Sequence, residues 1–152
     1  MANVKLFNSV SDLLPHRGEM ILLDGIESWG EDYLEATVLH NKGNLFSDLD
    51  GNVPAWVGVE YMAQAVSALA GIHALQKGEP IRIGLLLGTR KYKTEVPFFQ
   101  RDVKITIKVE QVFIDESNLA AFDCTIHSDK LLAGALVKAI QPDNIEDIIK
   151  SS

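Results

Sequence analysis

The chain has 152 residues, of which 47% are hydrophobic and 23% charged, and a formal net charge of −7. These values indicate one globular domain with a sizeable core, and the acidic balance argues against a general nucleic-acid-binding surface. A single cysteine, Cys124, excludes a disulfide within the chain, and no Cys/His metal-binding pattern appears. No charged leader followed by an apolar run is found, so we expect a cytoplasmic protein.

The first third of the chain predicts a short helical turn, two strands and a loop. Residues 10–14 form the turn, which ends at Pro15 because the residue before a proline avoids the helical region. The apolar run 20–26 predicts the first strand, and the alternating segment 33–40 predicts the second. Residues 41–53 are rich in Asn, Asp and Gly, as is typical of a loop.

A long apolar helix is predicted for residues 54–77. Pro54 suits the start of a helix, and Gly78 suits its end. The segment is apolar on nearly every side, which is typical of a helix inside a protein or a membrane. Its length of about 33 Å is nominally enough to cross a bilayer. Glu60 and Gln64 in its first turns argue against a membrane span, as does the ordinary composition of the remaining chain. We therefore expect a core helix wrapped by a sheet.

One acid stands out in this helix. Burying an unpaired carboxylate is costly, so we expect Glu60 to be paired, protonated or used in chemistry. Helical spacing places Glu60 on one face with Gln64, Ser67 and Gly71. A first-turn acid that is stabilised by the helix dipole is an equally good interpretation of Glu60.

Four strands are predicted after the helix. They cover residues 81–90 (extending towards 96), 103–113, 118–127 and 131–140, with a turn at 97–102 and a short helix at 144–150. Strands segregated from one helix predict an α+β fold with an antiparallel sheet. The sheet should curl around the apolar helix, and a free sheet edge favours a dimer.

Charge is unevenly distributed along the chain. Residues 82–108 carry seven Lys or Arg and two Asp or Glu, a local charge of +5, which leaves −12 for the remainder. We call residues 82–108 the basic strip. It can attract an acidic partner or a phosphate group. The alternative is a solvated sheet edge whose lysines discourage edge-to-edge pairing.

Two motifs resemble those of a known enzyme family. The first is Leu14-Pro-His-Arg17 followed by Met20-Ile-Leu-Leu-Asp24, and the second is Pro54 with Glu60-Tyr-Met-Ala-Gln64. Together they resemble the hot-dog-fold β-hydroxyacyl-acyl carrier protein dehydratases, and more closely the dehydratase-like proteins of aryl-polyene lipid clusters. The resemblance covers most of the chain, and the order of the two motifs makes it fairly specific.

The resemblance implies one hot-dog domain over residues 1–152, in a homodimer or in a heterodimer with a hot-dog homologue. Each active site lies at the dimer interface and uses a histidine of one subunit and the helix carboxylate of the other. The substrate is a 3-hydroxyacyl chain on the phosphopantetheine arm of an acyl carrier protein, in fatty acid or polyene lipid synthesis. No metal or other cofactor is implied. The implied site residues are Glu60 for catalysis, Ala55, Trp56, Gln64, Gly84 and Leu86 for substrate binding, and Arg90, Lys91 and Arg101 for carrier docking.

The family's catalytic histidine is missing. It lies about fourteen residues before the glutamate, where this chain has Phe46, or Asn44 if two residues are inserted. His40 is the nearest candidate base, although a surface histidine at the end of a strand is the alternative. We interpret His16, His73 and His127 as structural.

Three hypotheses follow for function. The first is a 3-hydroxyacyl-carrier-protein dehydratase in which Glu60 acts with His40 or a loop carboxylate. The second is a half-site or non-catalytic subunit that pairs with a histidine-bearing hot-dog homologue. The third is a hot-dog thioesterase, which also uses a helix carboxylate and depends less on the histidine. The helix motif favours a dehydratase-like protein over a thioesterase.

Overall fold

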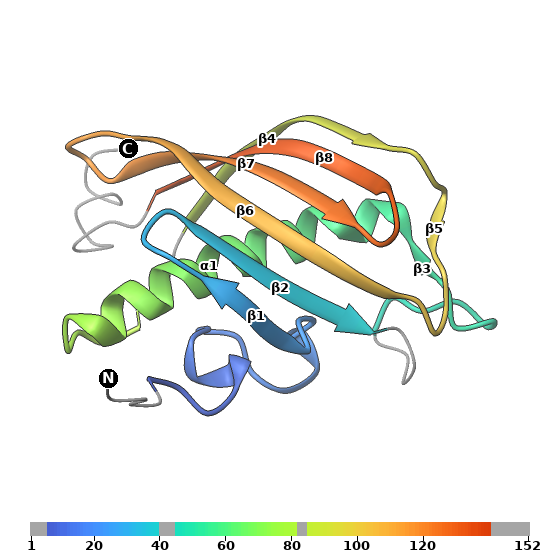
Figure 1. The fold of residues 1–152 in the computed structure, drawn as a ribbon, viewed down its shortest axis with the longest axis horizontal. Helices are drawn as coiled ribbons and strands as arrows, with labels where there is room; N and C mark the ends of the chain where they lie inside the picture. The colour runs from blue at the N-terminus through green and yellow to red at the C-terminus, as the bar shows by residue number, and fades with distance from the viewer. Residues whose placement is uncertain (1–5, 40–44, 82–84, 141–152) are drawn as a thin grey trace.

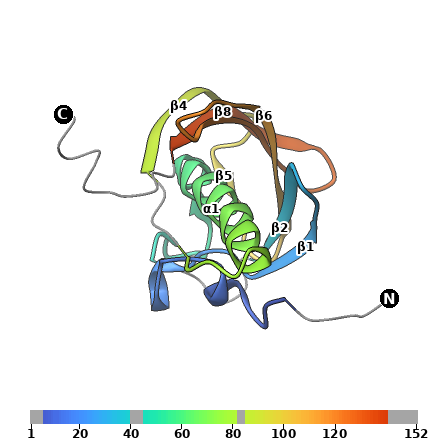
Figure 2. The ribbon, with the colours of Figure 1, turned by 90° about the vertical axis from the view of Figure 1, so that its left-hand side faces the viewer.

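One long helix lies inside a curled antiparallel sheet in the computed structural model, which describes residues 6–39, 45–81 and 85–140 (Figure 1). Seen from the end of the helix, the strands curve over it and the N-terminal segment lies beneath it (Figure 2). This arrangement confirms the predicted α+β hot-dog architecture, in which the apolar helix is enclosed rather than exposed.

Six antiparallel strands make up the main sheet, in the order β1-β2-β6-β7-β8-β4. Burial alternates along them, as in β2, where Leu34, Ala36 and Val38 are buried in the core. Such alternation is typical of a sheet that packs one face on a core. The strands are β1 (Gly25–Trp29), β2 (Tyr33–Leu39), β4 (Leu85–Thr94), β6 (Lys104–Ile114), β7 (Leu119–His127) and β8 (Leu131–Ile140).

The central helix α1 spans Gly58–Gln76 and follows a 3-10 turn, η3, at Ala55–Val57. Beyond its end, Gly78 has a φ of 68°, and its N–H donates to the carbonyl of Leu75 at 3.1 Å. A glycine in this left-handed conformation commonly ends a helix. In the described part of the chain, no helix is both long enough and apolar enough to cross a membrane.

The N-terminal segment packs directly on α1 through two 3-10 turns, η1 (Val10–Asp12) and η2 (Gly18–Met20). Leu13 and Leu14 are 0% and 1% exposed, so they anchor this segment in the core. The absence of a side chain at Gly71 permits the contact, because a Cβ atom there would lie 2.9 Å from the carbonyl carbon of Leu13. The segment between the two turns is therefore held close to the polar face of the helix.

The first predicted strand is wrong in its position. Residues 20–24 lie in η2 and in irregular chain, and β1 begins only at Gly25. The backbone carbonyl of Met20 and the backbone N–H of Leu22 bond to the side chain of Gln64 rather than to a neighbouring strand. A helix side chain thus replaces the sheet partner that the apolar run was expected to have.

A small second sheet was not predicted. It pairs β3 (Val53–Pro54) with β5 (Phe98–Phe99), which lies within the predicted turn 97–102. This pairing ties the segment before β6 to the start of the helix. The predicted helix at 144–150 lies outside the described residues.

Candidate active site

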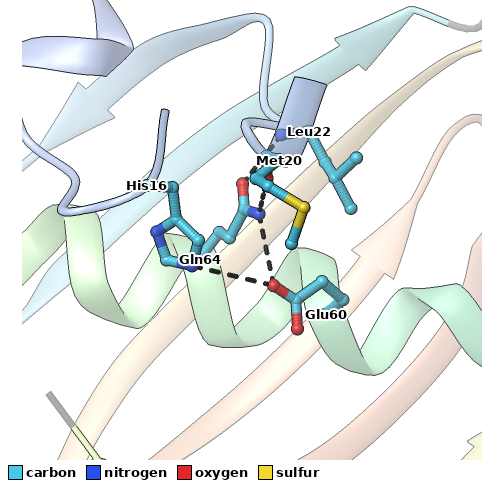
Figure 3. A network of polar contacts seen from close by, with 5 residues as sticks. All are labelled: His16, Met20, Leu22, Glu60 and Gln64. Carbon is cyan, nitrogen blue, oxygen red and sulfur yellow. Dashed lines mark hydrogen bonds and ion pairs between the residues drawn. The ribbon is translucent and has the colours of Figure 1, made fainter. Parts of the chain in front are cut away.

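The polar face of α1 carries a hydrogen-bonded amide at its centre. Gln64 is fully buried. Its Oε1 accepts from the N–H of Leu22 at 2.9 Å, and its Nε2 donates to the carbonyl of Met20 at 2.6 Å and to Oε1 of Glu60 at 3.2 Å (Figure 3). All polar groups of the side chain are thus used inside the protein, and direct substrate binding by Gln64 remains a prediction.

Glu60 lies one helical turn before Gln64, and its side chain is 42% exposed. Nε2 of His16 lies 3.9 Å from the same Oε1 atom that Gln64 contacts (Figure 3). Within the described ranges, no hydrogen bond or ion pair reaches the other carboxylate oxygen, Oε2. One oxygen of Glu60 is therefore anchored, whereas the second has no partner among the described residues.

The Leu-Pro-His-Arg motif gives His16 its position. Leu14 is buried beneath it, and the guanidinium of Arg17 donates from Nη1 to the carbonyls of Leu14 at 2.8 Å and His16 at 2.7 Å. Hydrogen bonds from a charged donor to backbone carbonyls hold a turn firmly. Arg17 therefore braces the chain on both sides of Pro15, and the ring of His16 faces the helix.

Tyr92 of β4 packs against the start of the helix. The Tyr92 hydroxyl donates to the carbonyl of Ala55, and burial raises the pKa of Tyr92 to about 12. The Tyr92 hydroxyl also packs against Gly58. The side chain of Ile126 lies close to the same glycine, because a Cβ atom there would be 2.9 Å from Cδ1 of Ile126. The N–H of Ala55 donates to the carbonyl of Pro97 at 3.0 Å. This N–H is thus used inside the chain, and substrate binding at Ala55 remains a prediction.

Apolar side chains are exposed around the same end of the helix. Trp56 is 63% exposed, and its ring meets that of Phe46 edge-on with centroids 5.5 Å apart. Phe98 on β5 and Met20 in η2 are also exposed. Phe46 is one of the two positions aligned with the family's missing histidine, and an apolar ring there supplies no acid or base.

Comparisons with known proteins identify the family of the chain and its fold. The ApeP-like family, described as ApeP dehydratase, matches residues 8–150. The chain belongs to the ApeP-like dehydratase family. A structure of the dehydratase heterocomplex ApeI:P, from Xenorhabdus doucetiae, superposes with a TM-score of 0.86 at 26% identity, over 96% of this chain and 99% of that one. No curated protein sequence matches the chain significantly.

Thioesterases share the fold at greater distance. A hypothetical thioesterase with coenzyme A from Streptococcus pneumoniae superposes with a TM-score of 0.58 at 16% identity, over 76% of this chain and 83% of that one. A thioesterase from Haemophilus influenzae gives 0.55 at 19% identity, over 79% and 80% of the two chains. At these identities the likeness shows the hot-dog fold alone, so the ApeP-like assignment stands above the thioesterase alternative.

For several predicted site residues of this ApeP-like chain, the structure does not test the predicted role. His40, Asn44 and Gly84 lie outside the described residues. Leu86 is paired in β4 opposite Ala139. Substrate contacts at Gly84 and Leu86, and a catalytic role for His40, therefore remain predictions.

The basic strip is not one continuous surface. Arg90, Lys91 and Lys93 lie on β4, whereas Lys104 and Lys108 lie on β6, and β7 and β8 separate these two strands. Lys104 also lies 3.9 Å from Glu27. The β4 residues Arg90 and Lys91 are exposed, and Lys91 has a φ of 56° at an irregularity in the pairing with β8.

Arg101 lies in the turn before β6, exposed and 3.7 Å from Asp102. Arg90 and Lys91, which were predicted to dock the carrier together with Arg101, lie on a different element, β4. Carrier docking therefore remains a prediction for all three residues. Two of them, Arg90 and Lys91, share the strand β4.

The candidate site includes one residue that the sequence did not assign to it. His16 was interpreted as structural, yet its ring contacts Glu60. The signal was the Leu-Pro-His-Arg motif itself, because it places an imidazole immediately after a rigid proline. What the sequence did not reveal is that Gly71 brings this turn onto the glutamate face of α1. Among the described residues, no group of three or more His, Cys, Asp or Glu side chains could hold a metal ion.

Proposed function

We propose that this chain takes part in the dehydration of a 3-hydroxyacyl thioester, with Glu60 as the general acid. The reaction breaks the α C–H bond, forms a C=C bond and expels the β-hydroxyl as water. It needs a base for the α proton and an acid for the hydroxyl. The observation that supports Glu60 is its geometry: one oxygen is anchored by Gln64, and the other is open on a half-exposed side chain.

We infer that the base comes from a second hot-dog subunit. Phe46 supplies no base at one of the two positions aligned with the family's histidine, and the similar Xenorhabdus structure is a dehydratase heterocomplex. Two features of this chain support a partner. Among the described strands, β4 is at one end of the sheet and pairs with β8 alone, and exposed edge strands readily pair with another chain. The exposed apolar side chains Trp56 in η3 and Phe98, which pairs with Pro54 before the helix, also suit an interface.

The acyl group is proposed to arrive on an acyl carrier protein. Exposed Arg90 and Lys91 on β4 give this acidic protein a local cationic surface. Oppositely charged surfaces steer an encounter and fix its register more than they increase affinity. A carrier docked on β4 would lie near Tyr92 of the same strand, whose hydroxyl contacts the residue at the start of the helix.

The experiment compares the purified chain alone with the chain mixed with a histidine-bearing hot-dog homologue. Each sample receives a 3-hydroxyacyl carrier protein, and the enoyl product is followed by mass. The half-site proposal predicts dehydration only in the mixture. Turnover by the chain alone would support a self-sufficient dehydratase, with His40 or His16 as candidate base, and would contradict the half-site proposal. Release of free acid would contradict dehydration altogether.

A further inference from the structure

The orientation of the Gln64 amide is fixed by its backbone partners. The Leu22 N–H can only donate, so the atom facing it must be the amide oxygen, and the carbonyl of Met20 can only accept, so it must face the NH2 group. The second N–H of that group then points to Oε1 of Glu60 at 3.2 Å. Gln64 is therefore a donor to Glu60 and cannot be an acceptor from it.

This donor determines which oxygen of Glu60 can carry a proton. An O–H group at Oε1 would face the N–H of Gln64, and two donors in contact form no hydrogen bond. A proton on the Glu60 carboxyl group therefore belongs on Oε2, the oxygen without a partner among the residues described. A general acid must carry its proton on the atom that faces the substrate. For Glu60, the oxygen that would donate this proton is Oε2.

His16 faces the same anchored oxygen. Its Nε2 lies 3.9 Å from Oε1, which is longer than a hydrogen bond, although contacts in substrate-free sites often tighten when substrate binds. Its Nδ1 is buried without a hydrogen-bond partner in the described chain. A buried N–H without an acceptor is unfavourable, so the ring should leave Nδ1 bare and carry its proton on Nε2.

We propose that His16 is a positioning residue for Glu60: as a neutral imidazole with its proton on Nε2, it joins Gln64 in keeping Oε1 an acceptor and confines the acid proton to Oε2. The inference rests on the function proposed for Glu60. It goes beyond it by assigning the Leu-Pro-His-Arg motif a task in the reaction. His16 acts through Glu60 and does not touch the reacting atoms.

The kinetic test uses two replacements of similar length. His16→Gln retains an N–H donor near the Nε2 position, whereas His16→Met fills the space without one. In the complex with the histidine-bearing partner, we expect His16→Met to lower kcat about tenfold with little change in KM, and His16→Gln to stay within about threefold of wild type. In a Glu60→Gln background, His16→Met should have no further effect. Equal losses in both His16 variants, or an additive loss in the Glu60→Gln background, would overturn the inference.

A spectroscopic test does not depend on activity. The full chain is labelled with 15N-histidine in the same complex, and the resonances of His16 are identified by their loss in His16→Gln. We expect the Nε2–H tautomer at neutral pH, and a shift of its Nε2 resonance in Glu60→Gln. The Nδ1–H tautomer or a doubly protonated ring would overturn the inference.

The two tests separate the possible failures. If the wild-type complex forms no enoyl product, the proposed function fails, and the spectrum alone decides the contact between His16 and Glu60. If the complex is active but the His16 variants do not follow the pattern above, the positioning role fails while the dehydratase proposal stands.

Discussion

The side-chain amide of Gln64 donates to the carboxylate of Glu60 across one turn of the central helix. The same amide also bonds the backbone at Met20 and Leu22. Gln64 therefore joins the N-terminal segment to the only carboxylate on this face of the helix, so folding of that segment and geometry of the site depend on one buried side chain.

Replacing Gln64 by Met should destabilise the protein. The near-isosteric side chain leaves the N–H of Leu22 and the carbonyl of Met20 without their partner, at a cost of about 1–3 kcal/mol for each buried group. Urea unfolding should therefore show a loss of about 2–6 kcal/mol. The control is Glu60→Gln on the half-exposed neighbour, which should remain within about 0.5 kcal/mol of wild type. A similar loss in both variants would contradict the special role of Gln64.

Replacing Gly71 by Ala should separate the N-terminal segment from the helix. The added Cβ atom would overlap the backbone of Leu13, which cannot move aside as a flexible side chain can. Overpacking of this kind costs about 1–3 kcal/mol, measured as the free energy of unfolding. The matched control is Gly88→Ala, because nothing lies within 4 Å of a Cβ atom there. Equal stability of the two variants would show that the close approach at Gly71 is unimportant.

Stability should fall in strong alkali because of Tyr92. Burial raises its pKa from 10.0 to about 12, so the folded state keeps the phenol proton more tightly than the unfolded state does. This contribution is complete below pH 10 and is lost as the pH rises through 12. Wild type should exceed Tyr92→Phe in stability at pH 8, by about 1 kcal/mol for the lost hydrogen bond to Ala55. That difference should shrink between pH 10 and 12, and a constant difference would contradict the burial of the phenol.

Reversing the charge on β4 should weaken the use of a carrier-bound substrate. We expect Arg90→Glu with Lys91→Glu to raise KM for a 3-hydroxyacyl carrier protein about tenfold at low salt, and less at high salt because ions screen exposed charges. The same thioester on free pantetheine should be unaffected. Lys104→Glu is the control, since Lys104 lies on β6 beside Glu27. Equal effects of the two changes would place carrier docking elsewhere.

Much of the fold could be predicted from periodicity. The alternation in β6 and β7, the apolar helix, and Gly78 at its end are local patterns, and the structure confirms them. The first strand was misplaced because its apolar run bonds to a helix side chain 42 residues or more away in sequence. The β3–β5 pair is only two residues long on each side, too short for alternation to appear.

Only part of the geometry at the candidate site could be predicted from the sequence. Glu60 stands out in sequence because it is an acid in an apolar helix. The contact of His16 with Glu60 is a tertiary one, created by the turn that Arg17 braces and by the gap at Gly71. The hydrogen bond from the amide of Ala55 to Pro97 was not predicted, because no local pattern reveals that pairing.

The most direct test of the central claim is the dehydration rate of Glu60→Gln, measured with the histidine-bearing partner and a 3-hydroxyacyl carrier protein. Loss of a general acid should lower kcat by about 10²- to 10⁴-fold, with folding and partner binding unchanged. Glu19→Gln, an exposed acid in η2, should retain full activity. A Glu60→Gln rate within twofold of wild type would contradict the assignment of Glu60 as the acid.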